Sequence, residues 1–243
     1  MTDTTTGDRT VERDALLLAV LPHVAFDGWT RQALRLGAED AGFGLDEAAI
    51  LFPGGIAELA DHLHGWADRA MLERLAEEGE AFESLRVREK IAQAVLARLD
   101  VLLPYRDAIR RDLARRALRP VSRRTLRQLH RTVDAMWRAA GDRSTDINYY
   151  SKRGLLAGVY ASTLLVWLDD RSEGQEITRA FLERRIGEVL AFGRQISGLK
   201  RLGDLAEAPF RLAARLREGR GAAAEAVARR VGSRERTQQR GLQ

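Results

Sequence analysis

Fifteen consecutive residues without a charged side chain, Gly154–Leu168, are the strongest constraint on the fold, because 31% of the chain is charged. A helix that is apolar nearly all round is buried all round, and this run is shorter than the roughly twenty residues that a bilayer-spanning helix needs. It therefore predicts a central core helix. A second interpretation stays open, in which one strip of the helix lines a cavity for an apolar ligand. The candidate lining residues are Leu155, Leu156, Val159, Tyr160, Thr163, Leu164 and Trp167.

The composition favours an all-α fold. Ala, Leu, Arg and Glu dominate the 243 residues, proline occurs five times, and no segment alternates with the period of a strand. The absence of cysteine excludes disulfides and thiolate metal sites. Residues 1–10 are rich in Thr and Asp and lack the pattern of a secretory signal or a transit peptide, so we expect a cytoplasmic protein.

Helical periodicity divides the chain into about nine to ten helices. We expect a disordered N-terminus over 1–10, a degenerate helix-turn-helix-like region over 11–80, a helical ligand-binding body over 81–197, and a basic amphipathic helix and tail over 198–243. This order resembles that of the TetR regulators. The expected helices span 14–25, 31–41, 46–52 (capped by Asp46), 56–77, 86–103, 104–118, 121–140, 148–168 and a last one that opens at a capping box formed by Ser172 and Gln175.

The charge of the second and third helices argues against DNA as a partner. A DNA reader needs basic side chains there, because neutralisation of phosphates dominates affinity. Between Leu36 and Asp68 there is no Lys or Arg, and the segment 46–52, at the position of a recognition helix, has no Arg, Lys, Asn or Gln to read a base edge. We therefore expect no nucleic acid partner. The same window contains seven carboxylates, those of Glu39, Asp40, Asp46, Glu47, Glu58, Asp61 and Asp68.

A long patterned motif surrounds the apolar run. It contains Val133-Asp134-x-Met136-Trp137, then Ala140-Gly141-Asp142-x-Ser144-Thr145-Asp146-x-Asn148-x-Tyr150-x-x-Arg153, then Leu156-Ala157-x-Val159-Tyr160-x-x-Thr163, and finally Phe181-Leu182-Glu183-x-Arg185-Ile186. Over about 118–190 this pattern resembles the ubiquinone (coenzyme Q) biosynthesis accessory family, and residues 12–110 resemble its TetR-like N-terminal half loosely. The resemblance implies a dimeric TetR-like fold that has lost DNA binding, holds an isoprenoid lipid or quinone intermediate, and aids a di-iron hydroxylase.

The resemblance also implies a surface for the hydroxylase, which maps onto Asp134, Met136, Tyr149 and Tyr150. Independently, two adjacent tyrosines diverge by about 100° on a helix, so both are unlikely core residues, and aromatic and Met side chains are enriched at protein interfaces. The simpler interpretation is that Thr145 or Asp146 caps the following helix. The chain departs from an animal-type member at Tyr149, where that member has Trp, and at Ile147, where it has Phe.

The C-terminal fifty residues are strongly basic, with twelve Lys and Arg against five Asp and Glu from Arg194 onward. Leu202, Leu205, Leu212 and Leu216 recur at helical spacing, which favours an amphipathic helix on an anionic membrane surface. Pro209 would kink that helix, and a surface helix packed on the body remains the alternative. A second basic run, between Arg106 and Arg127, predicts a solvated face, or a contact with anionic lipid or an acidic partner.

No catalytic set is present in the sequence. Glu58 and His62 are four residues apart, but no second Glu-x-x-His completes a di-iron pattern, and there is no phosphate loop, nucleophile elbow or dinucleotide motif. We therefore expect a protein without enzymatic activity or cofactor. From the resemblance we expect a homodimeric, peripheral inner-membrane protein that presents a quinone intermediate to the hydroxylase. The alternative is a TetR-like transcriptional regulator with a hydrophobic ligand.

Overall fold

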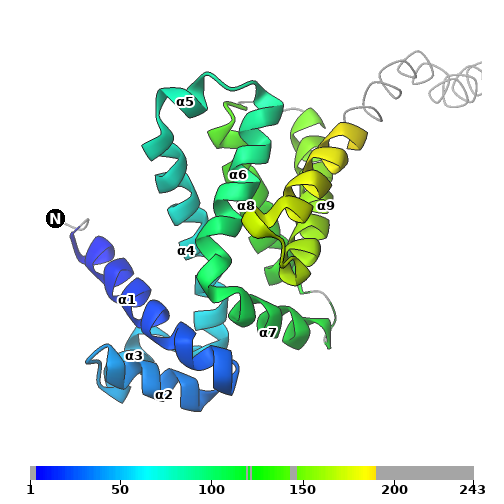
Figure 1. Ribbon diagram of the computed structural model, residues 1–243. Coiled ribbons are helices and arrows are strands. Elements are labelled where there is room, and N and C mark those ends of the chain that lie inside the picture. The colour runs from blue at the N-terminus through cyan, green and yellow to red at the C-terminus, as the bar shows by residue number, and fades with distance from the viewer. Residues whose placement is uncertain (1–3, 119, 121, 143–146, 190–243) are drawn as a thin grey trace, which may run out of the picture. The chain divides into compact units, whose positions relative to one another are not determined.

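A computed structural model of the chain describes residues 4–118, 120, 122–142 and 147–189. The chain divides into two compact units, 1–187 and 188–243. The described residues form helices and connecting turns, with no strand among them, so the predicted all-α fold is confirmed (Figure 1). No helix in this part of the chain has the length and apolar character needed to cross a membrane.

The helices follow the predicted order closely. Two short 3₁₀ turns, Leu103–Tyr105 and Glu173–Gln175, flank the later helices, and residues 176–189 are helical again. The α-helices are α1 (Thr4–Asp27), α2 (Arg31–Asp40), α3 (Leu45–Leu51), α4 (Gly55–Glu78), α5 (Glu80–Glu83), α6 (Val87–Leu102), α7 (Arg106–Ala117), α8 (Arg123–Ala139) and α9 (Ile147–Asp169).

The disorder predicted for residues 1–10 is wrong for residues 4–10. These residues belong to α1, which begins at Thr4 although the apolar pattern starts only near residue 14. Polar residues that show no periodicity of their own extend a helix when the following turns are already anchored in a core. Residues 1–3 lie outside the described part of the chain, as do residues 190–243.

Local hydrogen bonds explain where several helices begin. Thr30 accepts a hydrogen bond from the backbone N–H of Ala33, which starts α2, and Ser122 accepts one from Thr125, which starts α8. At α3 the backbone N–H of Gly44 donates to the Glu47 carboxylate at 2.7 Å. The predicted cap Asp46 therefore lies inside the first turn of α3, and the neighbouring acid at the third position stabilises the helix start instead.

The predicted capping box of Ser172 and Gln175 does not form as expected. The buried carboxylate of Asp170 accepts hydrogen bonds from the backbone N–H groups of Ser172 and Thr178, each at 2.8 Å. Gln175 donates to Asp100 at 2.9 Å and does not reach back to Ser172. A carboxylate two residues before the expected cap thus stabilises this helix start, because it can satisfy several N–H groups at once.

The first three helices pack closely. Gly37 of α2 lies directly against Val20 of α1, and a Cβ at residue 37 would lie 2.5 Å from the Cα of Val20. Real Cβ atoms do not approach backbone so closely, so the two helices meet at a point where a side chain does not fit. On α3 the side chains of Asp46 and Glu47 are exposed, so the helix at the recognition position presents carboxylates to solvent.

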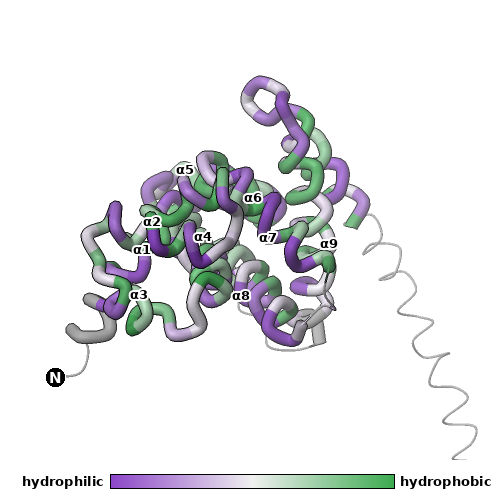
Figure 2. The backbone as a smooth tube through the Cα atoms, turned by 90° about the horizontal axis from the view of Figure 1, so that it is seen from below, coloured by the Kyte–Doolittle hydropathy of each residue, from purple (hydrophilic) through white to green (hydrophobic). Residues whose placement is uncertain are grey.

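The body is built from α4, α6, α8 and α9, which contact one another along amphipathic faces. In Figure 2 hydrophilic and hydrophobic stretches alternate along the helices, as expected when each buries one side. Trp167 of α9 and Leu99 of α6 are fully buried, so one side of the apolar run lies in the core, but Leu165 of the same run is 60% exposed, and the expectation that the helix is buried all round is wrong. One charged side chain, that of Arg98 on α6, is buried equally deeply among them.

Candidate functional site

An apolar cavity of about 210 Å³ lies beside α9. Its walls come from five helices, α4, α6, α7, α8 and α9, so it exists only in the folded body. Tyr160 and Leu164, which the sequence predicted as lining residues, both border it. The lining residues are His64, Arg98, Leu113, Arg116, Thr125, Gln128, Leu129, Thr132, Tyr160, Ala161, Leu164 and Leu165.

The other predicted lining residues lie elsewhere. Leu155 is 40% exposed and points away from the core. The remaining four are buried but do not border this cavity, and the hydroxyl of Thr163 donates to the carbonyl of Val159 at 2.8 Å. A helix that is apolar on every side does not reveal from its own pattern which side meets a void. These four residues are Leu156, Val159, Thr163 and Trp167.

One wall of the cavity is polar. The fully buried guanidinium of Arg98 donates to Asp68 at 2.8 Å and to the hydroxyl of Tyr160, and it also reaches the carbonyl of His64 at 3.3 Å. Thr132 donates to the same Asp68 carboxylate at 3.0 Å. Burial raises the pKa of Tyr160, so its phenol stays protonated. An otherwise apolar chamber therefore carries a hydroxyl and a guanidinium on one side.

Arg98 was missed by sequence reasoning, although a signal was present. On α6 it stands three residues after Val95 and four before Leu102, and both are buried. That spacing places Arg98 on the core stripe of the helix. A charged residue on a core stripe needs a buried partner of opposite charge, and here Asp68 of α4 supplies it.

The predicted partner surface is partly assembled in the structure. The hydroxyl of Tyr149 donates to Asp134 at 3.1 Å, and the nearly buried Arg153 donates to the same carboxylate at 2.6 Å and to Asp142 at 3.1 Å. The Arg153 guanidinium lies 3.5 Å from the centre of the Tyr149 ring. Burial opposes ionisation of Asp134, but hydrogen bonds from Arg153 and Tyr149 outweigh it and lower its pKa. Asp134, Tyr149 and Arg153 thus form a polar and aromatic cluster between α8 and α9.

Two members of the predicted surface do not join this cluster. Met136 has no exposed area and packs in the core, so its assignment to a partner-binding surface is corrected. Met136 lies one turn after the buried Val133, so both side chains lie on the core face of α8. The side chain of Tyr150 lies outside the described residues, and so do the predicted membrane-binding residues Leu202, Leu205, Leu212 and Leu216. Arg153, a member of the motif, was given no role from sequence.

Comparisons with known proteins identify relatives of the chain. Residues 122–193 match the family model described as COQ9. The chain is 34% identical over 195 residues to "Ubiquinone biosynthesis protein COQ9, mitochondrial" of Rattus norvegicus, which covers 78% of this chain and 62% of the relative. The same protein of Homo sapiens is 34% identical over 78% of this chain and 61% of the relative, and that of Drosophila melanogaster is 33% identical over 76% and 57%.

The chain thus spans about three-fifths of the length of the curated relatives that it matches. The resemblance to the ubiquinone biosynthesis family that the motif predicted is confirmed by these matches. A crystal structure of the TetR transcriptional regulator from Nitrosomonas europaea ATCC 19718 has a TM-score of 0.59 and 24% identity, and the match covers 73% of this chain and 97% of that one. This likeness confirms the TetR-like fold.

Proposed function

We propose that this protein serves ubiquinone biosynthesis as a lipid-binding accessory protein that does not itself catalyse a reaction. The relatives in that pathway support the role, and the cavity beside α9 is the observation that supports lipid binding. The surface that lines the cavity is mostly apolar, although many lining residues have a polar group, and its polar wall supplies the few oriented contacts that distinguish a ligand site from a packing defect. The ligand is an isoprenoid lipid or a quinone intermediate.

The size of the cavity suggests how such a ligand is held. At about 210 Å³ it lies below the roughly 300 Å³ at which pockets for drug-sized molecules begin, so it accepts one end of a long molecule. Leu165 borders the cavity and is 60% exposed, which supplies an apolar exit to the surface. The oxygen-bearing ring of the ligand faces Tyr160 and Arg98, and its isoprenoid chain leaves past Leu165.

Filling the cavity tests this assignment. Organic extraction of the purified wild-type protein, followed by mass spectrometry, is expected to recover an isoprenoid lipid. Ala161→Phe places a ring in the cavity, and we expect it to reduce the recovered lipid at least fivefold without lowering the thermal midpoint. Leu72→Phe, at an exposed position on α4 that does not border the cavity, is the control and retains the lipid. Wild-type protein without lipid, or Ala161→Phe with wild-type content, would refute lipid binding at this site.

We further propose that the cluster of Asp134, Tyr149 and Arg153 contacts the di-iron hydroxylase that acts on the quinone intermediate. Its support is geometric, because the cluster fixes a half-buried aromatic ring beside charged groups, as at interface hot spots. Tyr149→Ala is expected to weaken capture of the hydroxylase at least about tenfold, consistent with a hot-spot residue. Leu126→Ala, an exposed change on α8, is the control. Equal capture by both variants would remove this assignment.

The remaining parts of the proposal concern assembly and location. Leu155 and Ile177 expose apolar side chains on α9 and the following helix, which supports a homodimer formed through these helices. We place the protein peripherally on the inner membrane, bound to an anionic surface through the region after residue 198, which lies outside the described residues. The relatives' names include "mitochondrial", which agrees with an inner-membrane site.

A further inference from the structure

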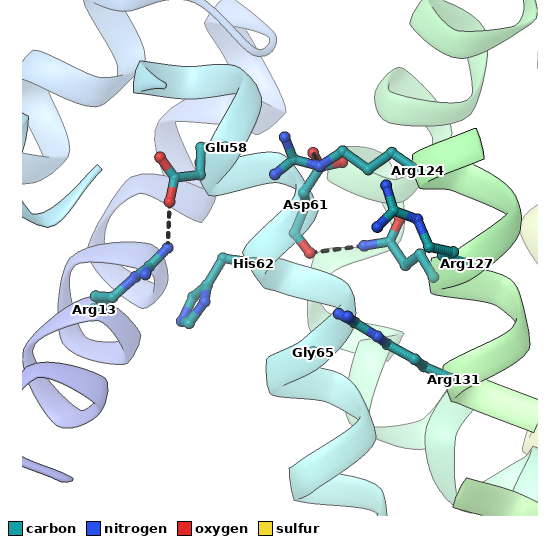
Figure 3. A pocket seen from close by; sticks show the side chains of 9 residues that line it. Arg13, Glu58, Asp61, His62, Gly65, Arg124, Arg127 and Arg131 are labelled. Carbon is teal, nitrogen blue, oxygen red and sulfur yellow. Dashed lines mark hydrogen bonds and ion pairs between the residues drawn. The ribbon is translucent and has the colours of Figure 1, made fainter. Parts of the chain in front are cut away.

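A polar cleft of about 440 Å³ lies between α1, α4 and α8, and it is distinct from the apolar cavity although Gln128 borders both. Four arginines line it, one from α1 and three from α8 (Figure 3). Figure 3 shows the guanidinium groups of Arg127 and Arg131 pointing from α8 toward α4, with that of Arg131 directed at Gly65. The other two arginines are Arg13 and Arg124.

The carboxylates of the cleft are already engaged. Glu58 pairs with Arg13 at 2.8 Å and also accepts the backbone N–H of Gly54 at 2.9 Å. Asp61 is shared between Arg124 at 2.5 Å and Arg116, which lies outside the cleft, at 2.6 Å. Two carboxylates therefore face four guanidinium groups, and one of the carboxylates is partly used elsewhere.

Two of the arginines are left without a countercharge among the described residues. Arg127 makes one long hydrogen bond, from Nε to the carbonyl of Arg123 at 3.4 Å, and Arg131 makes neither a hydrogen bond nor an ion pair within this part of the chain. On the opposite wall the Nε of Arg13 is shut off from solvent and has no acceptor. That Nε is closed to an anion, whereas the side chains of Arg127 and Arg131 are exposed, so the unpaired donors open to an anion are those of the two α8 arginines.

The cleft also has space on the side that faces Arg131. Gly65 presents no side chain there, and even a Cβ at that position would find its nearest atom, of Arg69, 3.9 Å away. His62 adds no positive charge at neutral pH, because burial lowers its pKa while its ring stays hydrogen-bonded to Asp14 at 2.7 Å. The excess positive charge is thus concentrated in the guanidinium groups, whose planar donor pairs match phosphate oxygens.

We propose that this cleft binds a phosphate-bearing anion, which Arg127 and Arg131 hold from α8 while Arg13 closes the site from α1. Residues four apart on a helix point in the same direction, so both α8 arginines reach one ligand. The phosphate comes either from a free organic phosphate or from a phospholipid headgroup. This site does not depend on lipid binding in the apolar cavity.

The test compares two full-length double variants of equal net charge. Arg127→Gln with Arg131→Gln removes the unpaired arginines, and Arg88→Gln with Arg123→Gln removes two exposed arginines outside the cleft. Because neither pair makes a side-chain ion pair, both variants should keep the wild-type thermal midpoint. Titration calorimetry at fixed ionic strength measures pyrophosphate binding. Sedimentation measures binding to phosphatidylcholine vesicles with and without phosphatidylglycerol.

We expect the cleft variant to bind at least tenfold more weakly than the wild type and the control variant. That difference with pyrophosphate identifies a site for a free phosphate compound, whereas the same difference only with phosphatidylglycerol vesicles identifies a headgroup site. Equal binding by the two variants to every probe would overturn the proposal. A pentaglutamate peptide that binds the wild type as tightly as pyrophosphate would also overturn it, because the site would then recognise an acidic protein segment.

Discussion

Replacing Arg98 with Met is expected to lower the free energy of unfolding by about 3–5 kcal/mol, since removing one partner of a buried ion pair strands the other charge. Asp68 would lose its closest cationic partner, at 2.8 Å, and the Tyr160 hydroxyl would lose its buried donor. For a chain of this size the change corresponds to a fall of about 10 °C in the thermal midpoint. Urea unfolding of the wild type and the variant measures it.

A second variant separates stranded charge from lost packing. Arg98→Met combined with Asp68→Leu removes both charges, so we expect it to recover most of the lost stability, as replacement of a buried pair by apolar residues is often neutral. If Arg98→Met alone costs less than about 1 kcal/mol, the value typical of an exposed pair, then the guanidinium is not held as the structure indicates.

Acid is expected to remove about 2 kcal/mol of stability through one buried carboxylate, Asp112. Burial opposes its ionisation, but hydrogen bonds and charges from His64 and Arg116 outweigh it and lower its pKa from 3.8 to about 2. Because the folded-state pKa lies below the unfolded one, this stabilisation is complete above about pH 4 and is lost as the pH falls toward 2. Burial also opposes ionisation of Asp170, but hydrogen bonds from Ser172 and Thr178 outweigh it and lower its pKa, so both carboxylates contribute to acid unfolding.

Asp112→Asn isolates the contribution of this carboxylate. The amide cannot offset the charges of Arg115 and Arg116, each 2.6 Å from the carboxylate, so the variant should be less stable than the wild type at pH 6. The difference between the two proteins should narrow steadily between pH 4 and pH 2 in urea titrations, because the wild type then loses its own charge. A difference that stays constant over this range would contradict the assigned pKa.

Much of the fold follows from local sequence signals. The uncharged run and the proline at residue 104 place the later helices within a few residues of their observed bounds. Signals of this kind act within one helix, so they predict its bounds even when the neighbouring helices are not known. The four-residue helix α5 and the first turns of α1 carry no such signal, since tertiary anchoring decides whether short or polar segments stay helical.

The sites depend on contacts that no single helix encodes. Tyr160 and Leu164 border the cavity because α6, α7 and α8 leave a void against that side of α9, whereas Trp167 meets close packing instead. Arg131 belonged to no sequence motif, and it becomes a candidate ligand only when α1 and α4 face it across the cleft. The family resemblance predicted Asp134 and Tyr149 as surface residues. The role of Arg153, which contacts both of them, is seen only in the structure.

The contact between Gly37 and Val20 has a consequence for natural variation. Every missense change in a glycine codon introduces at least a Cβ, and here that atom would lie 2.4 Å from the Cγ2 and 2.5 Å from the Cα of Val20 on α1, so the two helices would have to move apart. A substitution at residue 37 is therefore expected to alter the crossing of the first two helices. Selection should act against missense changes at this codon for as long as the crossing is needed.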